Sequence, residues 1–383
     1  MSKNPLEELY SQGQSAWLDN IHREMIQSGE LEQMIREDAL KGITSNPTIF
    51  QKAIASGTRY QDSIASMLQT KNDYNARDLF YQLAIDDIQH AADLLKPVYE
   101  ETKFCDGLVS IEVSPELAYD TEGTIKEARH LHNTVNRPNV MIKVPATKAG
   151  LPAIETLIAE GISINATLLF SVERYKDVAK AFLRGLKTRA ANGNDLAHVA
   201  SVASFFVSRV DVLVDKLLEE KLSTASDQQH NTLTALKGGI AIANAKLAYK
   251  VYEALFSSDQ FKSLKTKGAQ TQRLLWASTG VKNPDYRDVL YIEELIGPDT
   301  VNTMPPATMA AFKEHGNVAL TLTRDTDQAQ QAISTLGSLG LDLNAITDQL
   351  EKEGVKLFIE SFNSLLESIQ SSMQQIQQQA TGS

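Results

Sequence analysis

The chain has 383 residues, of which 42% are hydrophobic and 22% charged, as in an ordinary globular protein with one large domain or two smaller ones. Its net charge of −11, without a block of lysine and arginine, argues against nucleic acids and anionic membrane surfaces as partners. Its single cysteine, Cys105, excludes an intrachain disulfide framework and a cysteine metal cluster. Since the sequence contains neither a signal-peptide pattern nor an apolar run that could span a membrane, we expect a cytoplasmic protein.

Short apolar runs that alternate with longer helical patterns organise the chain. The predicted strands are Ser15–Ile21, Gly42–Pro47, Gly107–Ser114, Val140–Ala146, Ser163–Phe170, Val199–Val207, Arg273–Thr279 and Val301–Pro306. The predicted helices between them include Ala76–Lys96, Thr124–Asn136, Ala149–Glu160, Val172–Asn192 and Leu233–Ser257. Eight such strand–helix units predict an α/β fold, a (β/α)8 TIM barrel. A doubly wound sheet is the alternative, but no Gly-x-Gly-x-x-Gly turn follows the first strand.

Helical segments extend this minimal barrel. Gln51–Asp87 and Lys221–Lys265 carry helical insertions, and Gly354–Ile369 has apolar residues at the spacing of an amphipathic packing helix. Because no Pro/Gly/Ser-rich linker interrupts the chain, we expect one barrel domain over residues 1–369. The Gln/Ser-rich residues 370–383 are predicted to form a flexible tail.

Lys143 stands inside the apolar strand Val140–Ala146. Burial of an ammonium group is costly and favours the neutral amine, a nucleophile that can form a Schiff base with a carbonyl group. Lys143 is therefore the first catalytic candidate. The alternative is a lysine at a strand end whose ammonium group reaches solvent.

Side-chain alternation indicates which polar residues share the barrel interior with Lys143. Because Ile142 and Val144 suit the helix-facing layer, Lys143 should point inward. In four other strands the polar residues that share a face are Asp19, Thr44, Asn46, Ser110, Glu112, Ser114, Asn165 and Thr167. Any one of them alone could be a solvated strand end, but together they indicate the carboxyl mouth of the barrel, where active sites lie. A lysine with carboxylates and amides fits Schiff-base chemistry on a sugar.

Seven motifs follow one another in order over residues 15–310. They are Gly-Ile-Thr-Ser-Asn-Pro-Thr-Ile-Phe (42–50), Ser-Ile-Glu-Val-Ser (110–114), Met-Ile-Lys-Val-Pro-Ala-Thr (141–147), Ile-Asn-Ala-Thr-Leu-Leu-Phe-Ser (164–171), Ser-Phe-Phe-Val-Ser-Arg-Val-Asp (204–211), Trp-Ala-Ser-Thr-Gly-Val-Lys (276–282) and Val-Asn-Thr-Met-Pro-Pro-Ala-Thr (301–308). Together they resemble the longer branch of the transaldolase family. The resemblance implies a (β/α)8 barrel without metal or organic cofactor that acts on sugar phosphates in the pentose phosphate pathway. It would transfer a dihydroxyacetone unit from sedoheptulose 7-phosphate to glyceraldehyde 3-phosphate, giving erythrose 4-phosphate and fructose 6-phosphate.

The resemblance also assigns roles to single residues. Lys143 matches the Schiff-base lysine, and Asp19 matches the carboxylate that acts as general acid and base. Glu112 and Thr167 match the pair that holds a catalytic water. The residues that match substrate contacts in the dihydroxyacetone pocket are Thr44, Asn46, Asn165 and Ser204.

The phosphate site follows the family pattern only in part. Arg209 matches the phosphate arginine after the sixth strand. Many relatives carry a second arginine after the seventh strand, where this chain has Ser278 and Lys282, which we expect to replace it. A lysine supplies a point charge in place of a bidentate fork. The alternative for Lys282 is a solvated loop cation.

Other functions remain open at this point. A Schiff-base sugar-phosphate aldolase that releases free dihydroxyacetone would need the same lysine. A sugar-phosphate isomerase would form no adduct that borohydride traps. A barrel recruited as a scaffold would be expected to lose the acids and the lysine, yet Asp19, Glu112 and Lys143 are all present.

Overall fold

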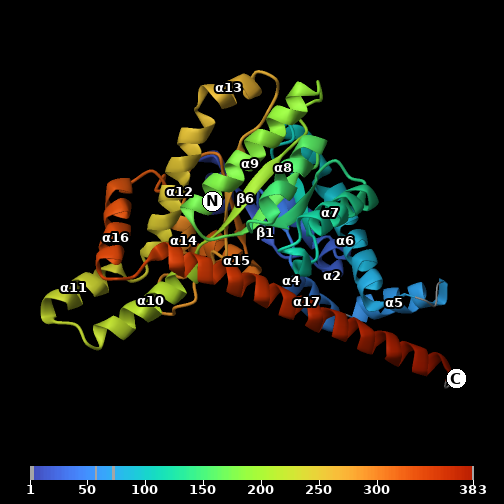
Figure 1. Ribbon diagram of the computed structural model, residues 1–383. Coiled ribbons are helices and arrows are strands. Elements are labelled where there is room, and N and C mark those ends of the chain that lie inside the picture. Colours follow the sequence, from blue (N-terminus) through green and yellow to red (C-terminus); the bar gives the residue numbers. More distant parts are fainter. Residues whose placement is uncertain (1–3, 57, 71–73, 382–383) are drawn as a thin grey trace.

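The computed structural model describes residues 4–56, 58–70 and 74–381 and contains a closed barrel of eight parallel strands (Figure 1). The strands are β1 (Gln14–Asp19), β2 (Gly42–Thr44), β3 (Leu108–Glu112), β4 (Val140–Pro145), β5 (Ile164–Leu169), β6 (Ser201–Phe206), β7 (Gln272–Ala277) and β8 (Thr300–Met304). Each strand pairs with its neighbours in chain order, and β8 pairs with β1. The predicted (β/α)8 barrel is therefore confirmed.

Helices surround the barrel and cover one of its ends. They are α1 (Pro5–Ser11), α2 (Arg23–Gln27), α3 (Glu30–Glu37), α4 (Pro47–Ser56), α5 (Thr58–Thr70), α6 (Ala76–Glu101), α7 (Thr121–Val135), α8 (Gly150–Glu160), α9 (Val172–Ala191), α10 (Ser208–Leu222), α11 (Asp227–Leu236), α12 (Ile240–Phe256), α13 (Asp259–Lys265), α14 (Leu290–Glu293), α15 (Pro306–His315), α16 (Thr326–Ser338) and α17 (Leu343–Thr381), with a 3₁₀ turn at Pro115–Leu117. Every strand residue is buried except Asp19 and Arg273, which are partly exposed. Burial on both faces is the usual state of a parallel sheet that helices enclose. Within the described residues, none of the helices combines the length and apolar character needed to cross a lipid bilayer.

One predicted helix is wrong in its extent. The sequence predicted a continuous helix over Leu233–Ser257, but α11 ends at Leu236 and α12 begins at Ile240. Gly238 has a φ of +70°, a left-handed conformation that interrupts a helix and that glycine adopts without steric cost. The carboxylate of Asp215 accepts the backbone N–H of Gly238 at 3.0 Å and so fixes this break.

Helix α17 lies along one end of the barrel (Figure 1). It contains the packing helix predicted for Gly354–Ile369 and contacts α4, α5, α6, α10 and β5. Residues 370–381, for which the composition predicted a flexible tail, continue the same helix, and its C-terminal end lies beyond α5 (Figure 1). The flexibility of this tail stays a prediction.

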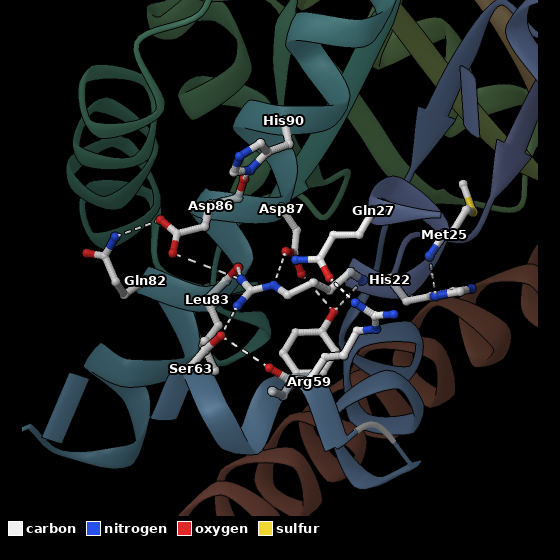
Figure 2. Close-up of polar contacts among 12 residues, drawn as sticks. His22, Met25, Gln27, Arg59, Ser63, Gln82, Leu83, Asp86, Asp87 and His90 are labelled. Atoms are coloured by element: carbon white, nitrogen blue, oxygen red, sulfur yellow. Dashed lines mark hydrogen bonds and ion pairs between the residues drawn. The ribbon is translucent and has the colours of Figure 1, made fainter. Parts of the chain in front are cut away.

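A buried ion pair fixes the segment that follows β1. Arg23, at the start of α2, places its Nε 2.8 Å from the Oδ1 of Asp87 on α6, and both side chains are buried. Figure 2 labels Asp87 and marks the polar contacts of this region with dashed lines. The Tyr60 hydroxyl on α5 donates to the other Asp87 oxygen at 2.7 Å and accepts the backbone N–H of Arg23 at 3.0 Å. Loss of one partner of such a pair leaves an uncompensated buried charge, at a cost of about 3–5 kcal/mol. The network therefore holds the chain in place only four residues after Asp19.

Candidate active site

A cavity of about 470 Å³ lies among the carboxyl ends of the strands. Of the eleven site residues predicted from the sequence, nine line it: Asp19, Thr44, Asn46, Lys143, Thr167, Ser204, Arg209, Ser278 and Lys282. The other two, Glu112 and Asn165, are buried on β3 and β5 and contact residues that line the cavity. The barrel therefore brings the predicted residues together around one space.

Lys143 is buried in the cavity wall. Its neighbours in the sequence, Ile142 and Val144, are fully buried, and its own side chain lines the cavity although the residue is only 4% exposed. The Nζ atom donates to the carbonyl oxygen of Ser45 at 3.1 Å and lies 3.3 Å from Oε2 of Glu112. The parallel register places Glu112 on β3 directly beside Lys143 on β4. The lysine thus meets a carboxylate in a site from which most water is excluded.

Glu112 is a buried carboxyl group with few hydrogen-bond donors around it. Burial raises the pKa of Glu112 to about 7; Lys143 opposes this increase in pKa, and Asp19 adds to it. In the part of the chain that the structure describes, neither carboxylate oxygen accepts a hydrogen bond apart from the contact with Lys143, and the Thr167 hydroxyl also has no partner. Buried polar groups without partners suit a water molecule or a substrate hydroxyl. A pKa near 7 allows Glu112 both to donate and to accept a proton at neutral pH.

Asp19 ends β1 at the cavity. Its Oδ1 atom accepts a hydrogen bond of 2.7 Å from the Thr44 hydroxyl, which also lies 2.7 Å from the hydroxyl of Thr303. Burial raises the pKa of Asp19, whereas the charge of Lys143 and the hydrogen bond from Thr44 lower it. The two threonines fix the direction of the carboxylate and leave its second oxygen for a substrate hydroxyl.

The two asparagines of the site lie at different depths: Asn46 lines the cavity, and Asn165 lies behind its wall. Asn165 is fully buried, accepts the Ser204 hydroxyl at 2.7 Å and donates to the Ser110 hydroxyl at 3.1 Å, so that it holds Ser204 at the cavity wall. The Oδ1 of Asn46 accepts the backbone N–H of Ile49 at 3.0 Å at the start of α4. This contact leaves the amide NH₂ group of Asn46 available to a ligand.

Two cations lie at one side of the cavity. Arg209, in the first turn of α10, is half-buried with its guanidinium 5.4 Å from the centre of the Phe206 ring, and burial lowers its pKa. Lys282 is exposed in the loop after β7. Among the described residues, no carboxylate forms an ion pair with either cation, so both can bind an anion.

Ser278 links the loop that carries Lys282 to the start of α10, which carries Arg209. Its hydroxyl lies 2.9 Å from the hydroxyl of Ser208, the residue before Arg209. Its φ of +56° falls in the left-handed region, which non-glycine residues rarely adopt. Such strain persists only where the surroundings enforce it, and it is common at ligand sites.

Sequence reasoning missed several cavity residues. Thr303 lines the cavity from β8, and its inward parity in the predicted strand Val301–Pro306 could have identified it. Lys52, Phe206 and Phe358 also line the cavity. No local pattern points to Phe358, because it belongs to a helix that the sequence presented only as packing. Within the described chain, no group of three or more His, Cys, Asp or Glu side chains is arranged to hold a metal ion.

Comparisons with known proteins agree with this geometry. A family model described as Transaldolase/Fructose-6-phosphate aldolase matches residues 16–369. A protein of Nostoc sp. named Transaldolase 2 is 46% identical over 97% of this chain and 98% of its own length. A Transaldolase of Trichodesmium erythraeum is 45% identical over 98% of this chain and 99% of its own. A Transaldolase 2 of Nostoc punctiforme is 47% identical over 97% and 98% of the two chains.

Proposed function

The chain belongs to the transaldolase/fructose-6-phosphate aldolase family, and from this membership we propose that its barrel site transfers dihydroxyacetone through a Schiff base on Lys143. The enzyme is a transferase of the transaldolase type, acting in the pentose phosphate pathway. It moves the three-carbon unit from sedoheptulose 7-phosphate to glyceraldehyde 3-phosphate and gives erythrose 4-phosphate and fructose 6-phosphate. The observation that carries the site assignment is the burial of Lys143 Nζ at 3.3 Å from Glu112 beside the cavity.

The first step joins Lys143 to the ketose. Its neutral amine adds to the C2 carbonyl to give a carbinolamine, which loses water and becomes an iminium ion. Glu112 gives the proton that the departing hydroxyl group needs, and a water held between Glu112 and Thr167 carries protons between these groups. The unpaired oxygens of Glu112 and Thr167 supply the hydrogen-bonding positions for that water.

The second step breaks the C3–C4 bond. Asp19, as a carboxylate, takes the proton of the C4 hydroxyl group, and the electrons of the C3–C4 bond move toward the iminium nitrogen. An aldose phosphate leaves, and an enamine remains on Lys143. When an acceptor aldehyde enters, the enamine carbon attacks it, and Asp19 returns the proton to the new hydroxyl group. Asn46 and the Ser204–Asn165 pair orient the hydroxyl groups of the three-carbon unit.

Glu112→Gln should slow imine formation by about 100-fold, because the amide cannot donate the proton that releases water. Burial raises the pKa of Glu112 to about 7, so the wild-type rate should fall as the pH rises through 7 and the acid form is lost. The variant should lack this decline. Borohydride trapping in single-turnover mixtures with fructose 6-phosphate, from pH 5 to 9, measures both effects. An unchanged pH profile in the variant would assign the proton to another group.

Arg209→Ala should reduce kcat/KM for fructose 6-phosphate by roughly 10- to 100-fold, the value of one charge-assisted hydrogen bond to phosphate. Lys282→Ala should reduce it less, because a lysine on an exposed loop gives one mobile point charge in place of a bidentate fork. Steady-state kinetics with fructose 6-phosphate and with unphosphorylated fructose separate binding of the phosphate from structural effects. If Arg209→Ala impairs both substrates equally, Arg209 is structural and the phosphate group binds elsewhere.

A sugar-phosphate aldolase that releases free dihydroxyacetone is the second candidate, because the same lysine and acids serve it. An assay that counts transferred and released dihydroxyacetone from one fructose 6-phosphate mixture decides between the two.

Sugar phosphates fit the family as substrates. We also propose a cytoplasmic location, since a chain with one free cysteine suits a reducing compartment. The net charge of −11 argues against nucleic acids and anionic membranes as partners.

A further inference from the structure

Phe358 places an aromatic ring from the C-terminal helix next to the catalytic lysine. Its ring centre lies 5.7 Å from the Nζ atom of Lys143, and the side chain lines the same cavity. The residue is only 5% exposed, whereas its neighbour Leu357 on the same helix is 48% exposed. Phe358 is therefore directed into the site while the other face of α17 meets solvent.

Contacts on both sides of Phe358 hold α17 in place. About two turns earlier, Oε2 of Glu351 lies 3.1 Å from Nε of Arg174, in an ion pair that is largely buried. After it, the Ser361 hydroxyl accepts a hydrogen bond of 2.9 Å from Thr48, and the Phe362 ring packs edge-on against Phe80. The ring above the lysine is thus fixed by a helix that contacts α9 before Phe358 and α4 and α6 after it.

A glycine lets this helix approach the barrel closely. A methyl group on Gly354 would lie 3.0 Å from the side chain of Leu168, so even an alanine would require that side chain or α17 to shift. Leu168 itself has a φ of +60° at an irregularity near the end of β5, next to Thr167. One helical turn after Gly354 comes Phe358, and the close approach at the glycine brings the ring within reach of the cavity.

We propose that Phe358 is a specificity-determining residue that keeps water from the enamine on Lys143 and so favours transfer over release of free dihydroxyacetone. This inference rests on the proposed Schiff-base function. Release requires solvent: water gives a proton to the enamine carbon and restores the iminium, and a second water adds to the former carbonyl carbon. The resulting carbinolamine then loses its C–N bond, which yields dihydroxyacetone and the free lysine amine. Transfer also ends with hydrolysis of an iminium, that of the new ketose phosphate, but it does not include the protonation of the enamine carbon.

The chemistry of the phenyl ring suits this role. It carries no proton donor, so it cannot protonate the enamine that it covers. Its face attracts a cation, and the iminium that precedes cleavage is cationic, so the ring is compatible with that intermediate. Exclusion of water from a reactive intermediate is a recognised way in which a closed site prevents hydrolysis.

The test compares the full-length wild type with Phe358→Ala, Phe358→Val and the matched control Leu357→Ala. Each protein receives fructose 6-phosphate with and without erythrose 4-phosphate, and the ratio of dihydroxyacetone released to dihydroxyacetone transferred is measured. We expect the ratio to rise about tenfold in Phe358→Ala, because a small decrease in the activation barrier for protonation of the enamine is enough for a tenfold change in rate. It should rise less in Phe358→Val and stay at the wild-type value in Leu357→Ala. If the alanine variant does not fold, the valine variant must still raise the ratio.

Two results would overturn the role of Phe358. One is an unchanged ratio in a folded Phe358 variant that still forms the borohydride-trapped adduct. The other is an equal rise in Leu357→Ala, which would indicate general loosening of α17. Failure of the proposed function looks different, because the wild type itself would then show neither adduct nor transfer.

Discussion

Lys143→Ala should lower dihydroxyacetone transfer by about 10⁴-fold or more, because removal of a covalent nucleophile leaves only the contribution of binding. The other lysines that line the cavity, Lys52 and Lys282, cannot replace it, since neither is placed next to Glu112 in the register of β3 and β4. The measurement is steady-state transfer from fructose 6-phosphate to erythrose 4-phosphate. The control Lys148→Ala removes an exposed lysine that does not line the cavity and should keep wild-type activity.

The variant must be shown to fold, because Lys143 is also half of a buried ion pair with Glu112. Without the cation, Glu112 takes up a proton and becomes neutral more readily, which limits the cost to stability. Lys143→Met keeps most of the volume of the side chain and serves as a second variant. If either protein is folded and still transfers dihydroxyacetone at a rate near that of the wild type, another residue carries the chemistry.

Asp19→Asn should lower the rate of carbon–carbon cleavage by about 10²–10⁴-fold, the usual contribution of a general base. The asparagine keeps an oxygen that can accept the hydrogen bond of 2.7 Å from Thr44, so the geometry of the site should persist. Asp19 acts after the iminium has formed, and the variant should therefore still give a borohydride-trapped adduct. Single-turnover trapping, run beside an assay for the released aldose phosphate, measures the two steps separately.

This prediction separates Asp19 from Glu112. The Glu112→Gln variant should be slow in trapping, whereas Asp19→Asn should trap at the wild-type rate and be slow only in cleavage. Equal defects of both variants in both steps would contradict the division of roles. They would indicate that Asp19 and Glu112 act as one coupled pair, which the influence of Lys143 on the pKa of both and of Asp19 on the pKa of Glu112 allows.

Local sequence patterns were sufficient to predict the strands and most of the residues that line the cavity. The alternation of Ile142, Lys143 and Val144 predicted an inward lysine, because side chains on a strand point to opposite faces in turn. The barrel places residues of the same parity in successive layers, and parity does not reveal depth. Asn165 and Thr167 share parity, yet Thr167 lines the cavity while Asn165 supports Ser204 from below.

Other features depend on contacts that no local pattern contains. The break between α11 and α12 is fixed by the carboxylate of Asp215, which is 23 residues from Gly238 in the chain. Phe358 reaches the site only because α17 packs across the mouth of a barrel whose eight strands all precede it. The strained Ser278 is likewise held by Ser208, the first residue of α10. Such long-range contacts decide positions that composition and periodicity leave open.

Mass spectrometry of the wild-type protein, reduced with borohydride in the presence of fructose 6-phosphate, tests the central claim most directly. The covalent mechanism predicts one added three-carbon glyceryl group on the peptide that contains Lys143. It also predicts no adduct when fructose 6-phosphate is omitted. An adduct on a peptide containing Lys52 or Lys282, or no adduct from a protein that carries out transfer, would contradict the assignment of Lys143 as the Schiff-base residue.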